Sequence, residues 1–277
     1  MPLCRAGRAS RHANDQRFPP GPTRLVAKHA AMSAHDLILC DIDGCLTPEN
    51  PVAIDRRHLA LIAERNERAG EHGLALVTLC TGRPQPFAEL LCRLLANTTV
   101  PCIAENGVWL YHPGTNAYLM DPAITDDHLC LISALEARLR SDYGRFGAAI
   151  QPGKTASLSL YHPDHTWLVG VRDQIAALVQ EKGWPLRVSM SWFYINCDLI
   201  HISKASGIRR LLEQHPRPRE RLAGIGDTLG DLAIADSVGW FGCPANADER
   251  LKPRAHRVAK SHETAGVWEL LQHLDTH

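Results

Sequence analysis

The sequence predicts an α/β protein with a Rossmann-like parallel sheet as its core and a small α+β domain inserted into that core. Early in the chain, apolar runs of strand length alternate with segments of helical periodicity, which is the rhythm of right-handed parallel crossovers. Between residues 113 and 196 the strands instead alternate polar and apolar residues, as in an antiparallel sheet covered on one face. After residue 196 the alternation of buried strands and helices returns. A length of 277 residues is enough for such a core and a smaller second domain.

The overall composition excludes several classes of partner. Lysine plus arginine equals aspartate plus glutamate, at 30 each, so no global field favours nucleic acid or a membrane surface. No apolar stretch approaches the ~18–20 residues that a membrane span needs. The nine cysteines form no Cys-x-x-Cys pair, and an odd number without a secretory signal indicates reduced thiols in the cytoplasm. We expect a small-molecule partner, no nucleic acid and no membrane; the sequence predicts no oligomeric state.

Residues 1–33 differ from the rest of the chain. They contain six basic residues against the single acid Asp15, and a Pro-Pro-Gly-Pro run at residues 19–22. Because they have no apolar central region, they do not form a secretory signal peptide. We expect a disordered basic extension, or upstream sequence translated from a misassigned start with Met32 as the natural one. A basic transit peptide is the alternative.

The first half of the core is predicted to contain three strands and two helices. The strand that starts at Leu37 ends in Asp41 and Asp43, with Gly44 directly after them. Pro101 interrupts the third strand, so we expect that strand to lie off-centre in the parallel sheet. The elements after the first strand are a helix over Asp55–Gly70, a strand over Leu74–Cys80, a helix over Phe87–Leu95 and a strand over Val100–Ala104.

The insertion and the second half of the core complete the predicted order. The core comprises residues 34–112 and 197–277, and the inserted domain comprises residues 113–196. In the insertion we expect helices over Asp127–Tyr143 and Thr166–Lys182, and strands over Ala156–Tyr161, Arg187–Ser191 and Phe193–Asn196. In the resumed core we expect a helix over Ser206–Gln214, a strand over Arg221–Ile225, short strands near Val238–Phe241 and His256–Val258, and a helix over Thr264–Leu274.

The two carboxylates that end the first strand suggest a metal site. Alternate strand residues point to one side, and the carboxyl ends of parallel strands face the ligand crevice of α/β proteins. Two neighbouring carboxylates repel unless a cation or a shared proton intervenes, so Asp41 and Asp43 favour Mg²⁺. A calcium loop of the EF-hand type is excluded, because its glycine and glutamate positions hold Leu46 and Val52. The alternative is a strand end followed by a plain Asp-Gly turn.

Four groups at strand or helix ends supply the parts that phosphoryl transfer through an aspartyl phosphate needs. A carboxylate attacks phosphorus, and a second carboxyl donates and then accepts a proton. A hydroxyl and an ammonium neutralise the phosphoryl oxygens, while further carboxylates bind Mg²⁺. The candidates are Asp41 with Asp43, Thr81, Lys204, and Asp227 with Asp231. Taken singly, each has a structural alternative: a turn hydroxyl, a solvated lysine, or a helix cap. Lys154 and Lys182 compete with Lys204 for the role of the ammonium.

In this order and spacing the motifs resemble those of the haloacid dehalogenase (HAD) superfamily phosphatases. Asp41–Gly44 is similar to the first motif, Thr81–Arg83 to the second, Lys204 to the third, and Gly226–Asp231 to the fourth. The resemblance covers residues 35–277. The insertion between the second and third motifs resembles the type IIB, or C2-cap, branch, as does the Glu-Asn-Gly sequence at residues 105–107. That branch includes sucrose-phosphate, mannosyl-phosphoglycerate and archaeal-type phosphoglycolate phosphatases, and phosphomannomutases.

The resemblance implies a role for each matching residue. Asp41 would be the nucleophile and a metal ligand, and Asp43 the general acid and base, with its backbone carbonyl on the metal. Thr81 and Lys204 would hold the transferring phosphoryl group. Asp227 would bind Mg²⁺, with Asp231 on the metal or directly behind its ligands. Contacts with substrate are expected from a further set of residues: Gly82, Arg83, Asn106 and Lys154. For Arg83 an ion pair, and for Lys154 plain solvation, is the alternative.

Two positions depart from the pattern of the superfamily. Cys45 stands where a threonine is usual, and Gly230 stands at an asparagine position of the fourth motif. Neither removes an essential group, but both bear on the positioning of the metal loop. Cys45 also adds a thiol that oxidation could reach.

The predicted function is a Mg²⁺-dependent phosphatase, a phosphoric monoester hydrolase acting on a small metabolite of the sugar phosphate or phosphoglycolate class. The inserted domain is expected to act as a cap that excludes water and selects the leaving group. One alternative is a phosphosugar mutase of the same family. Another, from a different class, is a receiver-like signalling domain with a phospho-accepting aspartate, which the length and the insertion disfavour.

We expect a chain that lacks residues 1–31 to fold and to keep the activity of the full chain, because the core begins after Met32. The measurements are the thermal midpoint and the turnover rate of both chains. A clear loss of either in the shortened chain would show that the extension belongs to the functional protein.

Overall fold

The computed structural model describes residue 18 and residues 33–191 and 193–276. The predicted extension over residues 1–33 therefore lies almost wholly outside the described residues. The described chain forms two compact units, a smaller one over Leu119–His201 and a larger one built from residues 33–118 and 202–276. The sequence places the domain limits at residues 113 and 196, and the residues between the two sets of limits include parts of two strands. Each unit is described by itself.

The larger unit is built on the parallel sheet that the sequence predicts. Its five strands lie in the order β12-β11-β10-β1-β2. In the central pairs, Leu37 of β1 is in register with Leu222 of β10 on one side and with Leu76 of β2 on the other. The strands are β1 (Leu37–Cys40), β2 (Leu76–Leu79), β10 (Leu222–Ile225), β11 (Trp240–Cys243) and β12 (Arg257–Val258). The predicted α/β class is confirmed.

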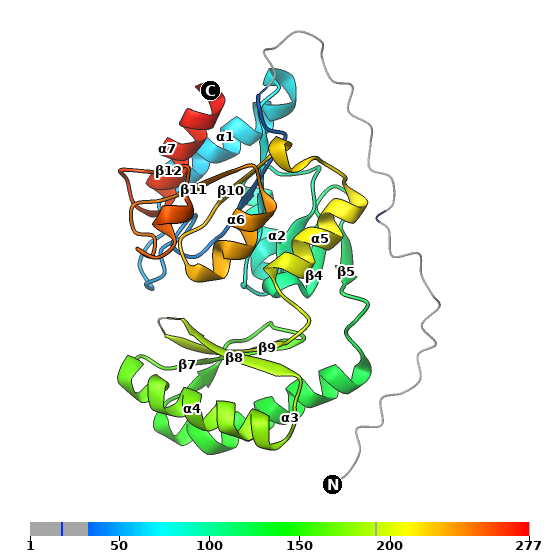
Figure 1. Cartoon of the computed structure of the whole chain (residues 1–277), viewed down its shortest axis with the longest axis vertical. Helices are drawn as coiled ribbons and strands as arrows, with labels where there is room; N and C mark the ends of the chain where they lie inside the picture. Colours follow the sequence, from blue (N-terminus) through cyan, green and yellow to red (C-terminus); the bar gives the residue numbers. More distant parts are fainter. Residues whose placement is uncertain (1–17, 19–32, 192, 277) are drawn as a thin grey trace. The chain divides into compact units, whose positions relative to one another are not determined.

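Helices cover both faces of this sheet (Figure 1). Ile38 and Cys40 of β1 join one apolar cluster with residues of the helices on their face. On the opposite face, Gly224 of β10 leaves so little room that a Cβ there would lie 2.4 Å from Ile234. The first face carries α1 (Arg56–His72), α2 (Gln85–Leu94) and α7 (Glu263–Thr276), and the second carries α5 (Lys204–Gln214) and α6 (Leu232–Ser237).

The third predicted strand does not belong to the parallel sheet in the expected way. β3 (Cys102–Ala104) pairs antiparallel with β4 (Trp109–His112), and β5 (Ala117–Met120) completes this second sheet. On the side of β2, β3 forms a single parallel bridge, between Ile103 and Cys80, the residue that follows β2. Pro101 has no N–H, so the strand cannot extend its pairing backwards. The β4–β5 hairpin was missed in the sequence, and it occupies the other edge of β3.

The smaller unit is the antiparallel α+β element that the alternating residues predict. Its sheet has the order β6-β7-β9-β8, and its two helices pack against one face. Leu160 pairs with Ile195 on that apolar face, whereas Ser159, Asn196 and Ser189 lie side by side on the opposite face. The elements are α3 (Asp126–Tyr143), β6 (Ala149–Ile150), β7 (Ser157–Tyr161), α4 (His165–Glu181), β8 (Leu186–Ser191) and β9 (Tyr194–Leu199).

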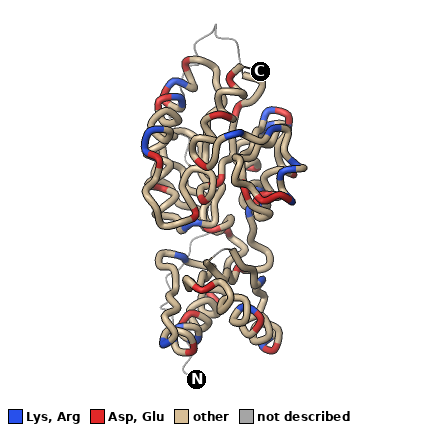
Figure 2. Tube along the Cα trace, turned by 90° about the vertical axis from the view of Figure 1, so that its left-hand side faces the viewer, with Lys and Arg blue, Asp and Glu red and all other residues tan. Residues whose placement is uncertain are grey.

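Charged residues of both signs are spread along both units of the described chain (Figure 2). Along the trace of each unit, lysine and arginine positions are interspersed with aspartate and glutamate positions (Figure 2). None of the described helices combines the length and the apolar character that crossing a bilayer requires.

A buried asparagine completes the edge of β2. Asn66 of α1 accepts a hydrogen bond from the N–H of Val77 (3.0 Å) and donates to the carbonyls of Val77 (3.2 Å) and Leu95 (2.8 Å). Its side chain therefore satisfies backbone groups of Val77, which lies away from the bridge between Cys80 and Ile103.

Replacing Asn66 by alanine should lower the free energy of unfolding by about 2–4 kcal/mol, because it leaves buried backbone groups without partners. Urea unfolding of the two proteins measures the difference. Asn66 lies away from the acidic strand ends, so turnover per folded molecule should not change. A loss below about 0.5 kcal/mol would show that water replaces the amide.

Candidate active site

The turn after β1 is the first part of the candidate site. Asp41 donates its N–H to the carbonyl of Ile225, which keeps it in line with β10 (3.0 Å). The chain then folds back at once, because the carbonyl of Ile42 accepts from three successive amides, those of residues 45, 46 and 47. Gly44 has a φ of +74°, and a Cβ there would lie 1.9 Å from Asp227 Oδ2. Only glycine fits this position, since it both tolerates the left-handed backbone and leaves room for the carboxylate.

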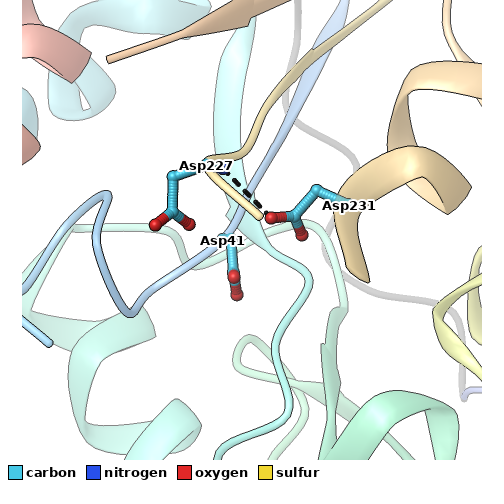
Figure 3. Close-up of side chains that lie close together, drawn as sticks. All are labelled: Asp41, Asp227 and Asp231. Carbon is cyan, nitrogen blue, oxygen red and sulfur yellow. Dashed lines mark hydrogen bonds between the residues drawn. The ribbon is translucent and has the colours of Figure 1, made fainter. Parts of the chain in front are cut away.

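The loop after β10 is folded by one of its own carboxylates. Asp231 Oδ2 accepts from the N–H groups of Asp227 and Thr228, both at 3.0 Å. The dashed line in Figure 3 marks the first of these bonds. Asp231 Oδ1 accepts from the ammonium of Lys204 at 2.7 Å. Both oxygens of Asp231 are thus occupied in holding the loop and the lysine.

Three buried carboxylates converge at this edge of the sheet. Asp41, Asp227 and Asp231 each offer an oxygen, and these oxygens lie within 4.8 Å of one another (Figure 3). Burial and repulsion from Asp231 outweigh the attraction of Lys204 and raise the pKa of Asp41 to about 7. Burial and repulsion from Asp231 and Asp41 raise the pKa of Asp227 to about 9, and Glu49 adds to this rise. A set of hard oxygen donors that resist ionisation together fits a divalent cation such as Mg²⁺.

Lys204 is the first residue of α5 and lies among these carboxylates. Its Nζ is 3.0 Å from Asp41 Oδ1 and 2.7 Å from Asp231 Oδ1, and the residue is only 8% exposed. Although burial lowers it, the pKa of Lys204 lies well above its usual value because of the two carboxylates. The lysine is therefore charged at neutral pH.

A left-handed turn fixes the segment that contains Thr81. Glu105 and Asn106 have φ values of +51° and +53°, which are uncommon for residues other than glycine. Their N–H groups donate to the carbonyls of Arg83 and Thr81, both at 2.9 Å. Thr81 is fully buried, and its Oγ1 accepts from the N–H of Arg83 at 3.1 Å. The same turn brings Asn106 Oδ1 within 3.1 Å of the position that a Cβ on Gly82 would take.

Asp43 and Arg83 form a pair beside the carboxylate cluster. Arg83 Nε donates to both oxygens of Asp43, at 2.9 and 2.8 Å, and Nη2 donates to Oδ1 at 2.5 Å. The guanidinium also lies over the ring of Phe87, 5.0 Å from its centroid. The carboxylate of Asp43 is not a member of the three-aspartate cluster. The metal contact expected from its backbone carbonyl stays a prediction.

The remaining residues singled out in the sequence lie elsewhere or act differently. Lys154 belongs to the smaller unit, in the loop before β7, so its contact with substrate stays a prediction. Cys45 is fully buried, with Sγ 3.8 Å from Asp227 Oδ1, and burial raises its pKa well above the usual value. Since the thiolate is the reactive form, this environment disfavours the oxidation that the sequence suggested.

Two residues that the sequence did not single out contact the turn after β1, which contains Gly44 and Leu46. Asn246 Nδ2 donates to the carbonyl of Gly44 at 2.8 Å, and Thr264 Oγ1 donates to the carbonyl of Leu46 at 3.0 Å. Both follow the last motif and belong to no strand end that points at the cluster. The signal available for Asn246 was the Pro-Ala-Asn-Ala sequence at residues 244–247, which follows shortly after the strand predicted near Val238–Phe241.

Comparison with known proteins agrees with this geometry. The chain is 26% identical to a phosphoglycolate phosphatase of Sulfolobus acidocaldarius over 241 residues, which cover 87% of this chain and 96% of that protein. It is 25% identical to a phosphoglycolate phosphatase of Haloarcula marismortui over 84% of this chain and 94% of that protein. A family model described as haloacid dehalogenase-like hydrolase matches residues 154–271, which include Lys204, Asp227 and Asp231. In sequence the chain is therefore similar to haloacid dehalogenase-like hydrolases.

The fold of the chain is also that of solved structures. A protein of Thermoplasma acidophilum superposes with a TM-score of 0.65 at 18% identity, over 88% of this chain and 99% of that one. The sucrose-phosphatase of Synechocystis sp. PCC6803, solved with sucrose and phosphate, superposes with a TM-score of 0.60 at 18% identity, over 87% and 98%. The predicted resemblance is confirmed, and so is the prediction that the chain is an enzyme of the phosphatase kind.

Without metal, the free energy of unfolding should fall as the pH rises from about 4 to about 9. A carboxyl whose pKa is raised by folding binds more protons in the folded state, so raising the pH favours the unfolded state. Asp41 rises from 3.8 to about 7 and Asp227 from 3.8 to about 9. The expected fall is several kcal/mol. Urea unfolding in EDTA across this range measures it.

The matched variant for this measurement is Asp227→Asn. It removes the titrating group with the larger rise in pKa, so its stability should depend less on pH than that of the natural chain. Added Mg²⁺ should restore stability at the alkaline end in the natural chain but not in the variant. Equal pH slopes for the two proteins would contradict the assignment of these groups.

Proposed function

We propose that this HAD-like phosphatase is Mg²⁺-dependent and hydrolyses a phosphate monoester of a small metabolite through an aspartyl-phosphate intermediate. The observation that carries the proposal is the contact of Lys204 with Asp41 inside the three-carboxylate cluster, with Nζ and Oδ1 3.0 Å apart. A buried carboxylate at the mouth of a parallel sheet, held by an ammonium and placed next to metal-binding oxygens, is suited to attack an anionic phosphorus centre.

Asp41 is the nucleophile in this proposal, and Asp227 and Asp41 hold the cation. Asp231 serves as the support behind them, because its two oxygens already accept from Lys204 and from the backbone of its own loop. When bound, Mg²⁺ neutralises phosphoryl oxygens and the attacking carboxylate. Lys204 supplies a second positive charge on the side of α5.

Thr81 completes the cradle for the phosphoryl group. Its Oγ1 accepts from the N–H of Arg83, so its hydroxyl proton can be donated to a phosphoryl oxygen. The turn at Glu105 and Asn106 fixes the backbone on either side of that hydroxyl. Gly82, whose missing side chain leaves room beside Asn106, allows the substrate to approach the backbone.

Asp43 acts as the general acid and base. In the described state its carboxylate is paired with Arg83, which holds it at a defined position beside Asp41. To protonate a leaving oxygen, Asp43 must first take up a proton, so the pair with Arg83 has to loosen when the substrate binds. The phosphate of the substrate is an alternative partner for the guanidinium, which accounts for a substrate contact by Arg83.

The proposed substrate class is phosphoglycolate or a small sugar phosphate. Relatives that match over most of their length are named phosphoglycolate phosphatases, and one structural neighbour is a sucrose-phosphatase. In this proposal the smaller unit is a C2-type cap that selects the leaving group, with Lys154 among its contacts. The balanced charge supports a small-molecule partner rather than a nucleic acid, and the odd number of cysteines without a secretory signal supports a cytoplasmic enzyme.

A phosphate-release screen tests the proposal. The purified protein is offered phosphoglycolate, sugar phosphates and other metabolite phosphates, with Mg²⁺ and with EDTA. We expect release from at least one small ester with Mg²⁺ and none with EDTA. Release that requires a sugar bisphosphate activator would instead identify a phosphosugar mutase, and release unaffected by EDTA would overturn the role of the metal.

Two substitutions separate the chemical roles. Asp41→Asn should lower turnover by about 10³-fold or more with an unchanged circular dichroism spectrum, because it removes the nucleophile. Asp43→Asn should slow both formation and hydrolysis of the intermediate by about 10²–10⁴-fold. Turnover near that of the natural chain in the first variant would refute the covalent route, and in the second the acid–base role.

A further inference from the structure

The loop that follows β11 contacts both acidic loops of the site. Asn246 donates from Nδ2 to the carbonyl of Gly44 at 2.8 Å, and the N–H of Asp248 donates to the carbonyl of Asp227 at 2.8 Å. The loop is closed on itself, since the N–H of Ala247 donates to the carbonyl of Pro244 at 3.1 Å. One short closed turn is therefore bonded to the segment that carries Asp41 and to the segment that carries Asp227.

We propose that Asn246 is a positioning residue that sets the separation of the Asp41 and Asp227 carboxylates, and through it the affinity for the divalent cation. The inference rests on the function proposed above. It assigns a role to a residue outside all four motifs.

The contact between Gly44 and Asp227 transmits the effect of Asn246. The Cα of Gly44 packs so closely on Asp227 that a Cβ would lie 1.9 Å from Oδ2 and 2.6 Å from Cγ. A rotation of the peptide at Gly44 would therefore move the surface against which the Asp227 carboxylate rests. The N–H of Gly44 donates to the carbonyl of Thr47 at 2.7 Å, within the same turn. The hydrogen bond from Asn246 to the carbonyl of Gly44 connects this turn to the loop that follows β11.

The second end of the Asn246 side chain is also used. Its Oδ1 accepts from the N–H of Glu263 at 2.8 Å, at the first residue of α7. Glu263 has a φ of +49°, a left-handed conformation that an acidic residue adopts only when its surroundings hold it. The next residue, Thr264, donates from its hydroxyl to the carbonyl of Leu46, in the turn after β1. The start of α7 and Asn246 therefore hold the same turn from two positions.

Interactions of this kind have measurable consequences for metal binding. Groups that orient metal ligands without touching the metal typically change its affinity by 10–100-fold when they are removed. Loss of the Asn246 amide should act in this range, because it frees the backbone on which the Asp227 carboxylate packs.

The test is Mn²⁺ binding to the full chain by isothermal titration calorimetry, with kcat and KM measured alongside. We expect Asn246→Ala to weaken Mn²⁺ about tenfold or more and to lower kcat at limiting metal, with KM for the phosphate ester little changed. The matched control is Asn66→Ala, which removes another bridging asparagine from the same unit. It should lower stability while leaving Mn²⁺ affinity within about twofold, as expected for a change that acts on stability alone.

A second variant, Asn246→Asp, covers the case in which the alanine variant does not fold. It keeps the acceptor for Glu263 but cannot donate to Gly44. Its added negative charge would by itself raise cation affinity, so weaker binding in this variant isolates the lost donor. Mn²⁺ affinity equal to that of the natural chain in the folded alanine variant, or affinity raised above it in the aspartate variant, would overturn the proposal.

Failure of this inference is distinguishable from failure of the proposed function. Asp227→Asn should abolish Mn²⁺ binding if the carboxylate cluster is the metal site. If that variant binds Mn²⁺ normally, the metal site itself is wrong and the role of Asn246 falls with it. If it loses binding but the Asn246 variants do not, only the positioning role is refuted.

Discussion

The contact of the Lys204 ammonium with the buried carboxylates of Asp41 and Asp231 is the interaction on which the rest of the site depends. Three ionised aspartates and one lysine leave a net charge of −2, from three negative charges and one positive. A single divalent cation balances that charge. Without the lysine the excess would be −3, and the carboxylate of Asp41 would be harder to keep ionised. The position of α5 is therefore an electrostatic requirement as much as a packing one.

Close backbone approaches give this charge arrangement its shape. Gly44 packs against the Asp227 carboxylate, and Gly207 of α5 lies so near Gly107 that a Cβ on Gly207 would be 2.9 Å from the Cα of Gly107. That second contact places the start of α5, and with it Lys204, against the left-handed turn that also fixes Thr81. One strained turn thus positions a hydroxyl and an ammonium that are far apart in the sequence. This coupling gives the left-handed backbone at Glu105 and Asn106 a structural role.

The sequence singled out the side chains that the structure brings together at the candidate site, but not the residues that support them. Strand-end carboxylates, the Thr81 segment and Lys204 were found because the ends of parallel strands meet, and because an apolar run marks each strand. Asn246 and Thr264 escaped because their partners are backbone carbonyls of a turn, which leave no pattern in side-chain type. The β4–β5 hairpin was missed for a similar reason, since four-residue strands give too few alternations to stand out. The expected pairing of β3 failed because periodicity says nothing about which neighbour a strand chooses.

The two faces of the sheet in the smaller unit are chemically distinct. Leu160 and Ile195 lie on the side that packs under α3 and α4, whereas Ser159, Asn196 and Ser189 stand in one row on the opposite side. Hydrophobic cohesion of this unit therefore resides in one layer, and the serine–asparagine row contributes little to it. Substitutions in that row can therefore change the chemistry of that face while the layer that maintains the fold is preserved. Chains with this architecture can differ on that face with no compensating change in their hydrophobic interior.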